Sequence, residues 1–475
     1  MSAEVATFAA TMKAATFRAV APGAICALAL VPAAALGAQE TAVPGVSLGL
    51  LYRNIYVPPI AVKPFAVESP GEEALGREIE MIIAQDLDFS DRFLVRDSLP
   101  TEFSGQGVQY ELWEQFEVDW LLAGSLAANP TGEGWVLTLE AHDIVYGSLQ
   151  DRGTFPIPES GSASFRMAVH TASDAIVEWV TGEVGIAATR VVFAMRAFGE
   201  QRGKELYIVD SDGENLRRLT WDQSLVASPV WSPDGTRIAY SSWKAGSARL
   251  YERHLRTGAD RALVPEGAGQ QLTPTYHPDG GEVVFAVIGA EPRGLYSYDA
   301  DRNCCLTHLG GGAYHDISPG YSPDGSEIVF MSNRLGVATP QVYVGKPVRG
   351  NVPELLSPYR YGDGGYFADP DWSPTSSRVA FSGGIAQRRQ ANRYHIFVAD
   401  VERGDNWLVQ LTQEGNNEDP SWAVDGRHIV FSGRRDYGSG VFVVDAITGR
   451  TRVLVANVEA ADPDWSPILA DGTTR

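Results

Sequence analysis

A short phrase, Pro-x-Trp/Tyr-Ser-Pro-Asp-Gly, recurs through the second part of this 475-residue chain, and an alternating apolar run follows most copies. Successive copies start 43 to 51 residues apart. A period of this length, with about four short strands in each unit, is typical of a β-propeller blade and not of a helical repeat. The six starts are Pro229, Pro274, Pro319, Pro370, Pro420 and Pro463.

The two ends of the repeat complement each other. Residues 190–194 read as the second strand of a blade with no first strand before it, whereas residues 463–467 read as a first strand with nothing after it. Pairing these two segments would complete a sixth blade and leave no open sheet edge. The fold predicted is therefore mainly β: a six-bladed β-propeller over residues 185–475, preceded by a small N-terminal α/β domain.

The N-terminal 38 residues are predicted to be a secretory signal peptide. Lys13 and Arg18 precede an Ala-rich apolar run that ends in small residues near Ala35 and Ala38. A membrane anchor is the alternative, but Pro22, Gly23 and Pro32 interrupt the run. We expect an exported, periplasmic protein.

Residues 39–184 lack the repeat and are predicted to form the α/β domain. Residues 72–88 carry apolar side chains at helical spacing, and residues 165–180 form a second expected helix, with a shorter one near 108–116. Expected strands cover residues 46–52, 60–65, 93–95, 120–124 and 135–139.

Composition excludes several classes of partner and site. A net charge of −21 argues against binding to nucleic acid or to an anionic membrane, which requires clustered Lys and Arg. After export only the adjacent Cys304 and Cys305 remain, and plain thiols are favoured over a redox pair or a zinc site.

No catalytic constellation emerges from the sequence. Residues 45–49 spell Gly-x-Ser-x-Gly but do not link a core strand to a helix. His170, Ser173 and Asp174 lie on one expected helix and cannot converge on a substrate as a triad does. The Asp of each Pro-Asp-Gly is read as a turn residue, and the repeated Trp and Tyr are read as core. We expect no enzyme activity, metal or cofactor.

Several segments together resemble the TolB family, periplasmic proteins of the Tol-Pal system of Gram-negative bacteria. The resemblance rests on residues 60–65 (Ile-Ala-Val-Lys-Pro-Phe), on His-Thr-Ala-Ser-Asp at 170–174 leading into Thr189-Arg190-Val191, and on the repeated phrase with its terminal Pro-Asp-Trp-Ser-Pro. It covers essentially the whole mature chain.

The resemblance implies a non-enzymatic coupling protein that supports outer-membrane integrity and constriction during cell division. One mouth of the propeller would bind the peptidoglycan-associated lipoprotein Pal, and the N-terminal segment would bind TolA. We expect residues 39–53 to act as a switch that weakens the Pal site when docked and binds TolA when released. The alternative is an exported propeller that binds carbohydrate or peptide, or acts as a lyase-like enzyme.

Geometry predicts which mouth is free. The small domain leads into a second strand, and second strands begin on the Pro-Asp-Gly side, so that side should face the small domain. The opposite mouth would then be formed by residues just before each Pro, with Arg334 and Arg434 in nearby loops. An alternative is that these residues form only a solvated rim or a weak cation site. The partner-binding candidates are Gln270, Thr273, His315, Asp316, Ser318, Asp369, Glu418, Asp419 and Asp462.

Overall fold

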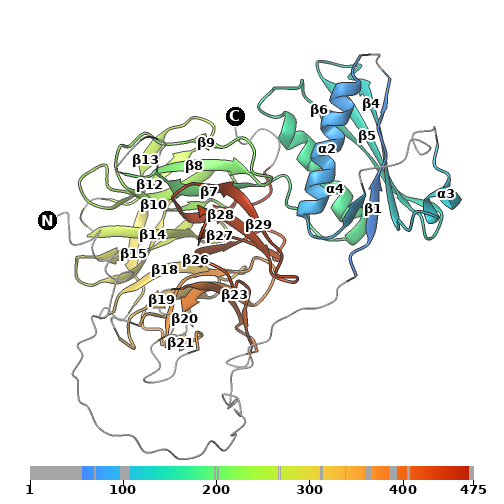
Figure 1. Cartoon of the computed structure of the whole chain (residues 1–475). Coiled ribbons are helices and arrows are strands. Elements are labelled where there is room, and N and C mark those ends of the chain that lie inside the picture. The colour runs from blue at the N-terminus through green and yellow to red at the C-terminus, as the bar shows by residue number, and fades with distance from the viewer. Residues whose placement is uncertain are drawn as a thin grey trace, which may run out of the picture.

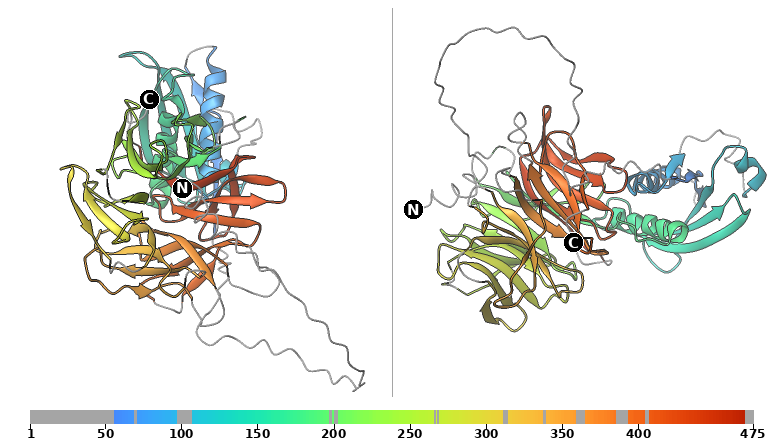
Figure 2. Two further views of the ribbon diagram at one scale, coloured as in Figure 1. Left: turned by 90° about the vertical axis from the view of Figure 1, so that its left-hand side faces the viewer. Right: turned by 90° about the horizontal axis from the view of Figure 1, so that it is seen from below.

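The computed structural model describes two domains that meet side by side (Figure 1, Figure 2). The predicted signal peptide, the Gly-x-Ser-x-Gly segment, the expected strand at 46–52 and the N-terminal switch lie outside the described residues. The described residues are 56–68, 71–96, 107–196, 199, 203–265, 267, 269–310, 314–336, 339–358, 365–384, 393–403 and 407–469.

The small domain is a mixed sheet with two long helices packed against it. The strand order is β3-β1-β4-β5-β6, with β2 beside β4. The apolar faces of both long helices enter one core with the sheet, which is why their sequences repeat at helical spacing. The elements are β1 (Pro59–Val62), β2 (Ala66–Val67), α2 (Glu73–Phe89), β3 (Leu94–Arg96), α3 (Tyr110–Glu114), β4 (Trp120–Ala128), β5 (Trp135–Asp143), β6 (Ser148–Ile157) and α4 (Phe165–Thr181).

The long edge strand β6 was not predicted. β6 is ten residues long, and most of its side chains are exposed, so its sequence lacks an alternating apolar pattern. It forms as an edge strand because it pairs with the whole of β5. No helix in the described part of the chain has the length and apolar character needed to cross a bilayer.

The remaining strands form six four-stranded antiparallel sheets, which confirms the predicted propeller. We number them blades 1 to 6. Blade 1 is β10 (Val226–Trp231), β11 (Arg237–Ser242), β12 (Arg249–His254) and β13 (Asp260–Ala262); blade 2 is β14 (Gln270–Tyr276), β15 (Glu282–Ile288), β16 (Gly294–Asp299) and β17 (Cys304–His308); blade 3 is β18 (Asp316–Tyr321), β19 (Ile328–Ser332), β20 (Gln341–Gly345) and β21 (Glu354–Leu355). Blade 4 is β22 (Tyr366–Trp372), β23 (Arg378–Gly384), β24 (His395–Asp400) and β25 (Leu408–Gln410); blade 5 is β26 (Asn416–Trp422), β27 (His428–Arg435), β28 (Gly438–Asp445) and β29 (Thr451–Ala456); blade 6 is β30 (Ala460–Trp465), β7 (Arg190–Met195), β8 (Glu205–Asp210) and β9 (Arg217–Arg218).

The ring closes in blade 6, where the last strand of the chain pairs with the first strand of the propeller. β30 runs antiparallel to β7, with Trp465 opposite Val191 and Ala460 opposite Met195. The indole nitrogen of Trp465 donates a 2.7 Å hydrogen bond to Thr189 Oγ1, just ahead of β7. Closure therefore joins segments more than 260 residues apart.

The repeated aromatic residue is core, as expected. It ends each inner strand and packs between neighbouring blades, where burial of a large ring contributes most to stability. Its six copies are all less than 9% exposed: Trp231, Tyr276, Tyr321, Trp372, Trp422 and Trp465.

The Asp residues of the repeated turn bond to their own loop, also as expected. Asp324 Oδ1 accepts hydrogen bonds from the Ser322 hydroxyl and from the Ser326 amide, and Gly325 has φ 71°. These hydrogen bonds, the Ser322 hydroxyl foremost, lower the pKa of Asp324 to about 2.

The expectation for the two cysteines was wrong. Cys304 and Cys305, at the start of the outer strand of blade 2, are joined by a disulfide. The bridge spans a single peptide bond, so it constrains almost no loop and contributes little chain entropy to the fold.

Trp465→Ala should lower the free energy of unfolding by about 3–5 kcal/mol, because it removes a buried ring at the ring closure. Trp221→Ala is the matched control: this indole is 65% exposed, so the loss should stay below about 1 kcal/mol. Urea unfolding followed by circular dichroism measures both, and equal losses would contradict the role given to the closing strand.

Candidate functional site

Each inner strand carries a bulge at the mouth opposite the repeated turns. The bulge begins at one residue with positive φ, and the Pro of the repeated phrase follows it. The strand pairing shifts its register at this point, so the missing N–H of Pro leaves no ladder bond unmade. The six residues are Ser228 (φ 49°), Thr273 (45°), Ser318 (51°), Asp369 (51°), Asp419 (56°) and Asp462 (52°). We call them the bulge ring.

Hydrogen bonds connect neighbouring members of the bulge ring. The Ser228 amide donates to Asp462 Oδ2 at 3.0 Å, and the Asp462 amide donates to Asp419 Oδ2 at 3.2 Å. On the other side of the ring the Ser318 amide donates to Thr273 Oγ1 at 3.0 Å. A short polar side chain at each bulge therefore supports the adjacent blade, which explains why the position before Pro is Ser, Thr or Asp.

Five of the nine predicted partner-binding residues belong to the bulge ring: Thr273, Ser318, Asp369, Asp419 and Asp462. The other four, Gln270, His315, Asp316 and Glu418, lie nearby at or near the starts of inner strands. The structure thus brings all nine to one mouth. It also gives the ring members a structural role that the sequence did not indicate.

Asp316 forms an ion pair with an arginine of the same blade. The Arg334 guanidinium donates to both carboxylate oxygens, at 2.9 and 3.0 Å, and lies over the ring of Tyr343 at 4.6 Å. The neighbouring His315 lies 3.3 Å from Arg293, and burial together with this guanidinium lowers the His315 pKa. On blade 3 the mouth therefore presents a neutral imidazole and a paired carboxylate.

Two further carboxylates lie two residues beyond the bulge ring. Asp371 Oδ2 accepts the Trp422 amide and Asp464 Oδ2 accepts the Trp231 amide, both at 2.7 Å, so each links its own blade to a neighbour. Burial raises the pKa of Asp371 to about 7 and that of Asp464 to about 8. These groups titrate near neutral pH.

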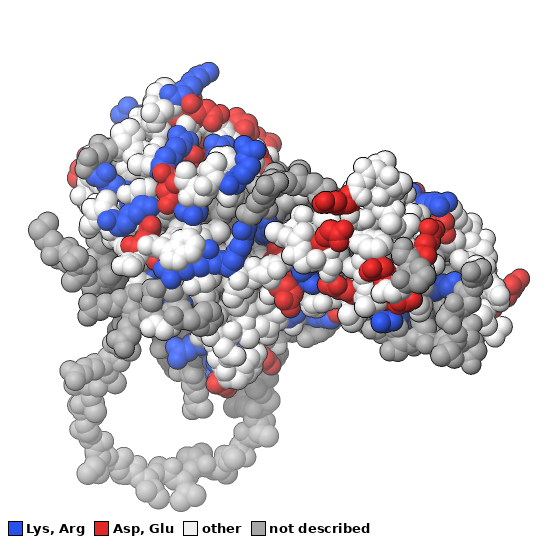
Figure 3. Space-filling model, turned by 90° about the horizontal axis from the view of Figure 1, so that it is seen from above, with Lys and Arg blue, Asp and Glu red and all other residues white. Residues whose placement is uncertain are grey.

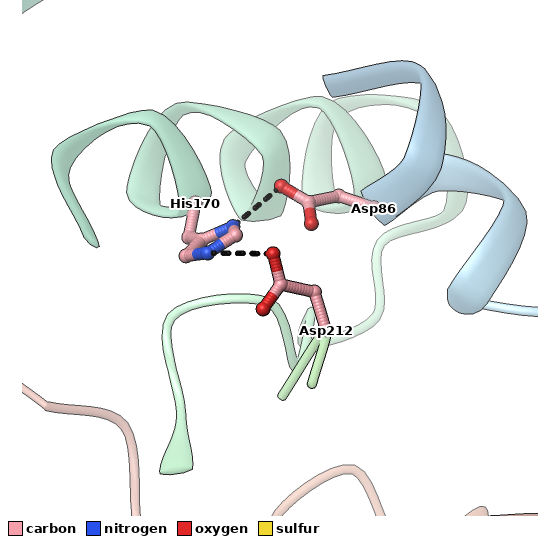
Figure 4. A group of neighbouring side chains, drawn as sticks. All are labelled: Asp86, His170 and Asp212. Carbon is pink, nitrogen blue, oxygen red and sulfur yellow. Dashed lines mark hydrogen bonds and ion pairs between the residues drawn. The ribbon is translucent and has the colours of Figure 1, made fainter. Parts of the chain in front are cut away.

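The opposite side of the ring faces the small domain, as geometry predicted. There His170 of α4 lies between two carboxylates (Figure 4). Its Nδ1 is 2.8 Å from Asp86 of α2, and its Nε2 is 3.6 Å from Asp212 in the turn between β8 and β9. Arg166 pairs with the same Asp212. His170 and Ser173 are completely buried, so a catalytic role for this motif has no route to a substrate.

Asp86, His170 and Asp212 carry atoms that can bind a metal ion, but they are not arranged as a metal centre. Asp86 and Asp212 flank opposite nitrogens of one imidazole, and the Arg166 cation occupies Asp212. The carboxylates around His170, Asp86 first, outweigh the opposing effect of burial and raise its pKa to about 9, so the ring is an imidazolium at neutral pH. A metal would have to displace that proton.

A second histidine bridge joins the domains on blade 5. His428 is fully buried, with Nδ1 2.7 Å from Asp425 and Nε2 3.2 Å from Asp91 of the small domain. Asp425 belongs to a repeated turn and also reaches Arg92 of the small domain at 3.3 Å. This turn therefore has a second role beyond the one predicted.

Sequence reasoning missed the partners in these bridges. One signal was present: Asp86 stands on the otherwise apolar face of α2, between Ile83 and Leu87. A carboxylate there requires a buried partner. Nothing in the sequence pointed to Asp212 or Asp91.

Asp462→Ala should destabilise the fold by about 1–3 kcal/mol, because it leaves the Ser228 amide without its acceptor and places alanine at positive φ. Asp462→Asn keeps an acceptor and a residue that tolerates this conformation, so it should cost less than about 1 kcal/mol. Urea unfolding ranks the two, and equal costs would contradict the supporting role of the side chain.

Asp464→Asn should raise the thermal midpoint relative to wild type at pH 8.5, and the gain should shrink as pH falls to 5. The folded-state pKa is raised above the unfolded value of about 3.9, so this contribution is complete below that value and is lost as pH rises through about 8. Asp324→Asn is a control of opposite sign, because the Asp324 pKa is lowered. Calorimetry across this range checks both.

Comparison with known proteins follows the same division into two domains. Residues 177–469 match the sequence profile of the TolB beta propeller domain, and residues 53–149 match that of the TolB amino-terminal domain. The structure is similar to the crystal structure of TolB from Acinetobacter baumannii, with a TM-score of 0.72 over 87% of this chain and 97% of that one, at 23% identity. That likeness concerns the fold.

Curated relatives are named Tol-Pal system protein TolB. The protein from Methylococcus capsulatus is 32% identical over 217 residues, and that from Escherichia coli K12 is 33% identical over 216 residues. These alignments cover 44% and 43% of this chain and 48% of each relative, so the chain spans about half the length of the relatives it matches. The propeller profile alone covers more than half of the chain, and the chain belongs to the TolB family.

Proposed function

We propose that this protein is a non-enzymatic periplasmic component of a Tol-Pal system. The mouth with the bulge ring would bind a Pal-like peptidoglycan-associated lipoprotein, and the N-terminal segment would bind a TolA-like inner-membrane protein. Such a protein supports outer-membrane integrity and constriction during division. Family membership and the names of the curated relatives support the system, and the partners are our inference.

The observation that carries the proposal is the free mouth. The ion pairs between the small domain and the propeller lie on the turn side of the ring, which leaves the bulge-ring side uncovered by the described residues. At that mouth the bulge ring fixes the backbone, because its side chains bond to neighbouring blades. A fixed polar rim suits reversible recognition of a folded partner.

The structure also limits which candidates can face a partner. Asp419 is buried and accepts hydrogen bonds from Ser432 and Asp462, and Asp316 is held by Arg334. Gln270 and Glu418 are partly exposed beside them. These two side chains are the better contact candidates, whereas Asp419 and Asp316 shape the rim.

Glu418→Lys combined with Gln270→Lys should abolish capture of a peptidoglycan-bound lipoprotein from an envelope extract. The reason is that two cations replace a carboxylate and an amide at the rim without removing a ring support. Asp301→Lys, an exposed charge reversal on the far side of blade 2, is the control and should retain capture. Capture of a glycan or a peptide in place of a lipoprotein would overturn the proposal.

Deleting residues 39–53 should abolish binding of a purified periplasmic TolA domain while the fold stays intact. Titration calorimetry measures the affinity, and far-UV circular dichroism is the control for folding. An unchanged TolA affinity would refute the assignment of this segment, and Pal binding measured on the same deletion tests whether the segment regulates the mouth.

A further inference from the structure

We infer that the small domain is fastened to the propeller by two charged histidine bridges, and that it detaches as a folded unit when a bridge loses its charge. The bridges are Asp86–His170–Asp212 and Asp425–His428–Asp91. This concerns the docking of the two domains and does not depend on the partner-binding role proposed above.

The two bridges are reciprocal. In the first, the small domain supplies the imidazole and one carboxylate, and the propeller supplies the second carboxylate (Figure 4). In the second, the propeller supplies the imidazole and one carboxylate, and the small domain supplies Asp91. Each imidazole therefore places one nitrogen toward each domain. An imidazolium carries a proton on both nitrogens, whereas the neutral ring carries only one. At His170 the Nδ1 contact with Asp86 is a hydrogen bond and the 3.6 Å Nε2 contact with Asp212 is an ion pair.

The small domain carries a large negative charge, and cationic groups of the propeller face it. Residues 56–189 contain 22 acidic and 6 basic side chains, a formal charge of −16. Figure 3 shows acidic groups gathered on the small domain and Lys and Arg prominent on the propeller in the same view. The docking surface of the propeller contributes three arginines: Arg427 donates to the Asp91 carbonyl, Arg450 pairs with Asp88 and Asp91, and Arg452 lies over the Phe89 ring at 4.2 Å.

Among the groups that form ion pairs at this interface, the carboxylates outnumber the arginines by two. Seven carboxylates make ion pairs there: Asp86, Asp88, Asp91, Glu183, Asp212, Asp425 and Asp445. Five arginines face them: Arg92, Arg166, Arg427, Arg450 and Arg452. Two imidazolium charges make up the difference. Loss of either one leaves an uncompensated carboxylate at a buried site, which is strongly destabilising.

Three other titratable groups lie around the bridges. Asp174 accepts the Ala187 and Ala188 amides, and burial raises its pKa to about 7. Asp210 pairs with Arg190 inside the propeller. Glu214 is an exposed neighbour of Arg166. None of these three replaces the charge of an imidazole.

Each domain has a core of its own, so a lost bridge separates domains and does not unfold them. The small-domain core contains no propeller residue, and the cores of blades 5 and 6 share residues with each other. Among the described residues, the ion pairs between the domains involve blades 5 and 6, and Met167 of α4 packs with buried residues of blades 6 and 1.

The pH dependence of domain docking follows from the direction in which the two histidine pKa values are shifted. The pKa of His170 is raised to about 9 and that of His428 is raised, in each case by flanking carboxylates that outweigh burial. Their contribution to docking is complete below the unfolded histidine pKa of about 6.5 and is lost as pH rises through the folded values. Arg452 has its pKa lowered to about 10, so a test of the histidines stays below that pH.

The test compares the full chain with Asp212→Asn and His428→Gln by small-angle scattering and hydrogen exchange. Asp212→Asn removes the propeller half of one bridge while its turn acceptor for the Glu214 amide is kept, so neither core is disturbed. Both variants should enlarge the radius of gyration at pH 7.5. Exchange should rise at least tenfold in residues 86–92 and 209–215, and the core strands β4 and β5 should stay protected.

His308→Gln is the matched control, because this histidine contacts a blade 2 carbonyl away from the interface and its loss should change neither measurement. Wild type taken from pH 7.5 to 9.5 should expand in the same way and recover when the pH is lowered. Variants with the dimensions and exchange of wild type, or a wild-type radius constant to pH 9.5, would overturn the inference. Loss of protection in β4 and β5 would also overturn it, because the bridges would then hold the fold of a domain and not the docking.

Discussion

The pairing of β30 with β7 is the constraint on which the rest of the structure depends. Six blades can share one packed interior only if the first and last meet, and the strand that closes them comes from the end of the chain. Without it β7 would present a free edge, and the Trp465 ring would leave the interface between blades 5 and 6. The bulge ring needs the same closure, because Asp462 on β30 links blade 5 to blade 1.

The blade phrase specified the propeller because its residues act locally and repeat. Pro marks a bulge, the aromatic residue fills a gap between blades, and Asp-Gly closes a hairpin, so all three can be recognised in one period of sequence. The positions at the mouth could be located for the same reason, because they lie before Pro. Their bonding to neighbouring blades was not foreseen, because it joins equivalent positions that are 43 or more residues apart.

The small domain and its docking were harder to predict. β6 was not predicted because its side chains are mostly exposed and its sequence has no alternating apolar pattern. The two histidine bridges depend on residues brought together only by the tertiary fold: Asp91 and His428 are 337 positions apart. His170 could be placed on a helix, but its charge state depends on a carboxylate in a propeller turn. The disulfide between Cys304 and Cys305 was also missed, since neighbouring cysteines carry no sequence signal for their oxidation state.

The closure in blade 6 has a mechanical consequence. The connector from the small domain enters the ring at β7, which is hydrogen-bonded to β8 on one side and to β30 on the other. Tension applied through the small domain would reach the ring along the axis of a strand flanked on both sides, so the ladders would resist it in shear and share the load between the first and last segments of the propeller. A strand at a free edge would instead open one bond at a time. The strand pairing that closes the ring would therefore also carry a load applied through the connector.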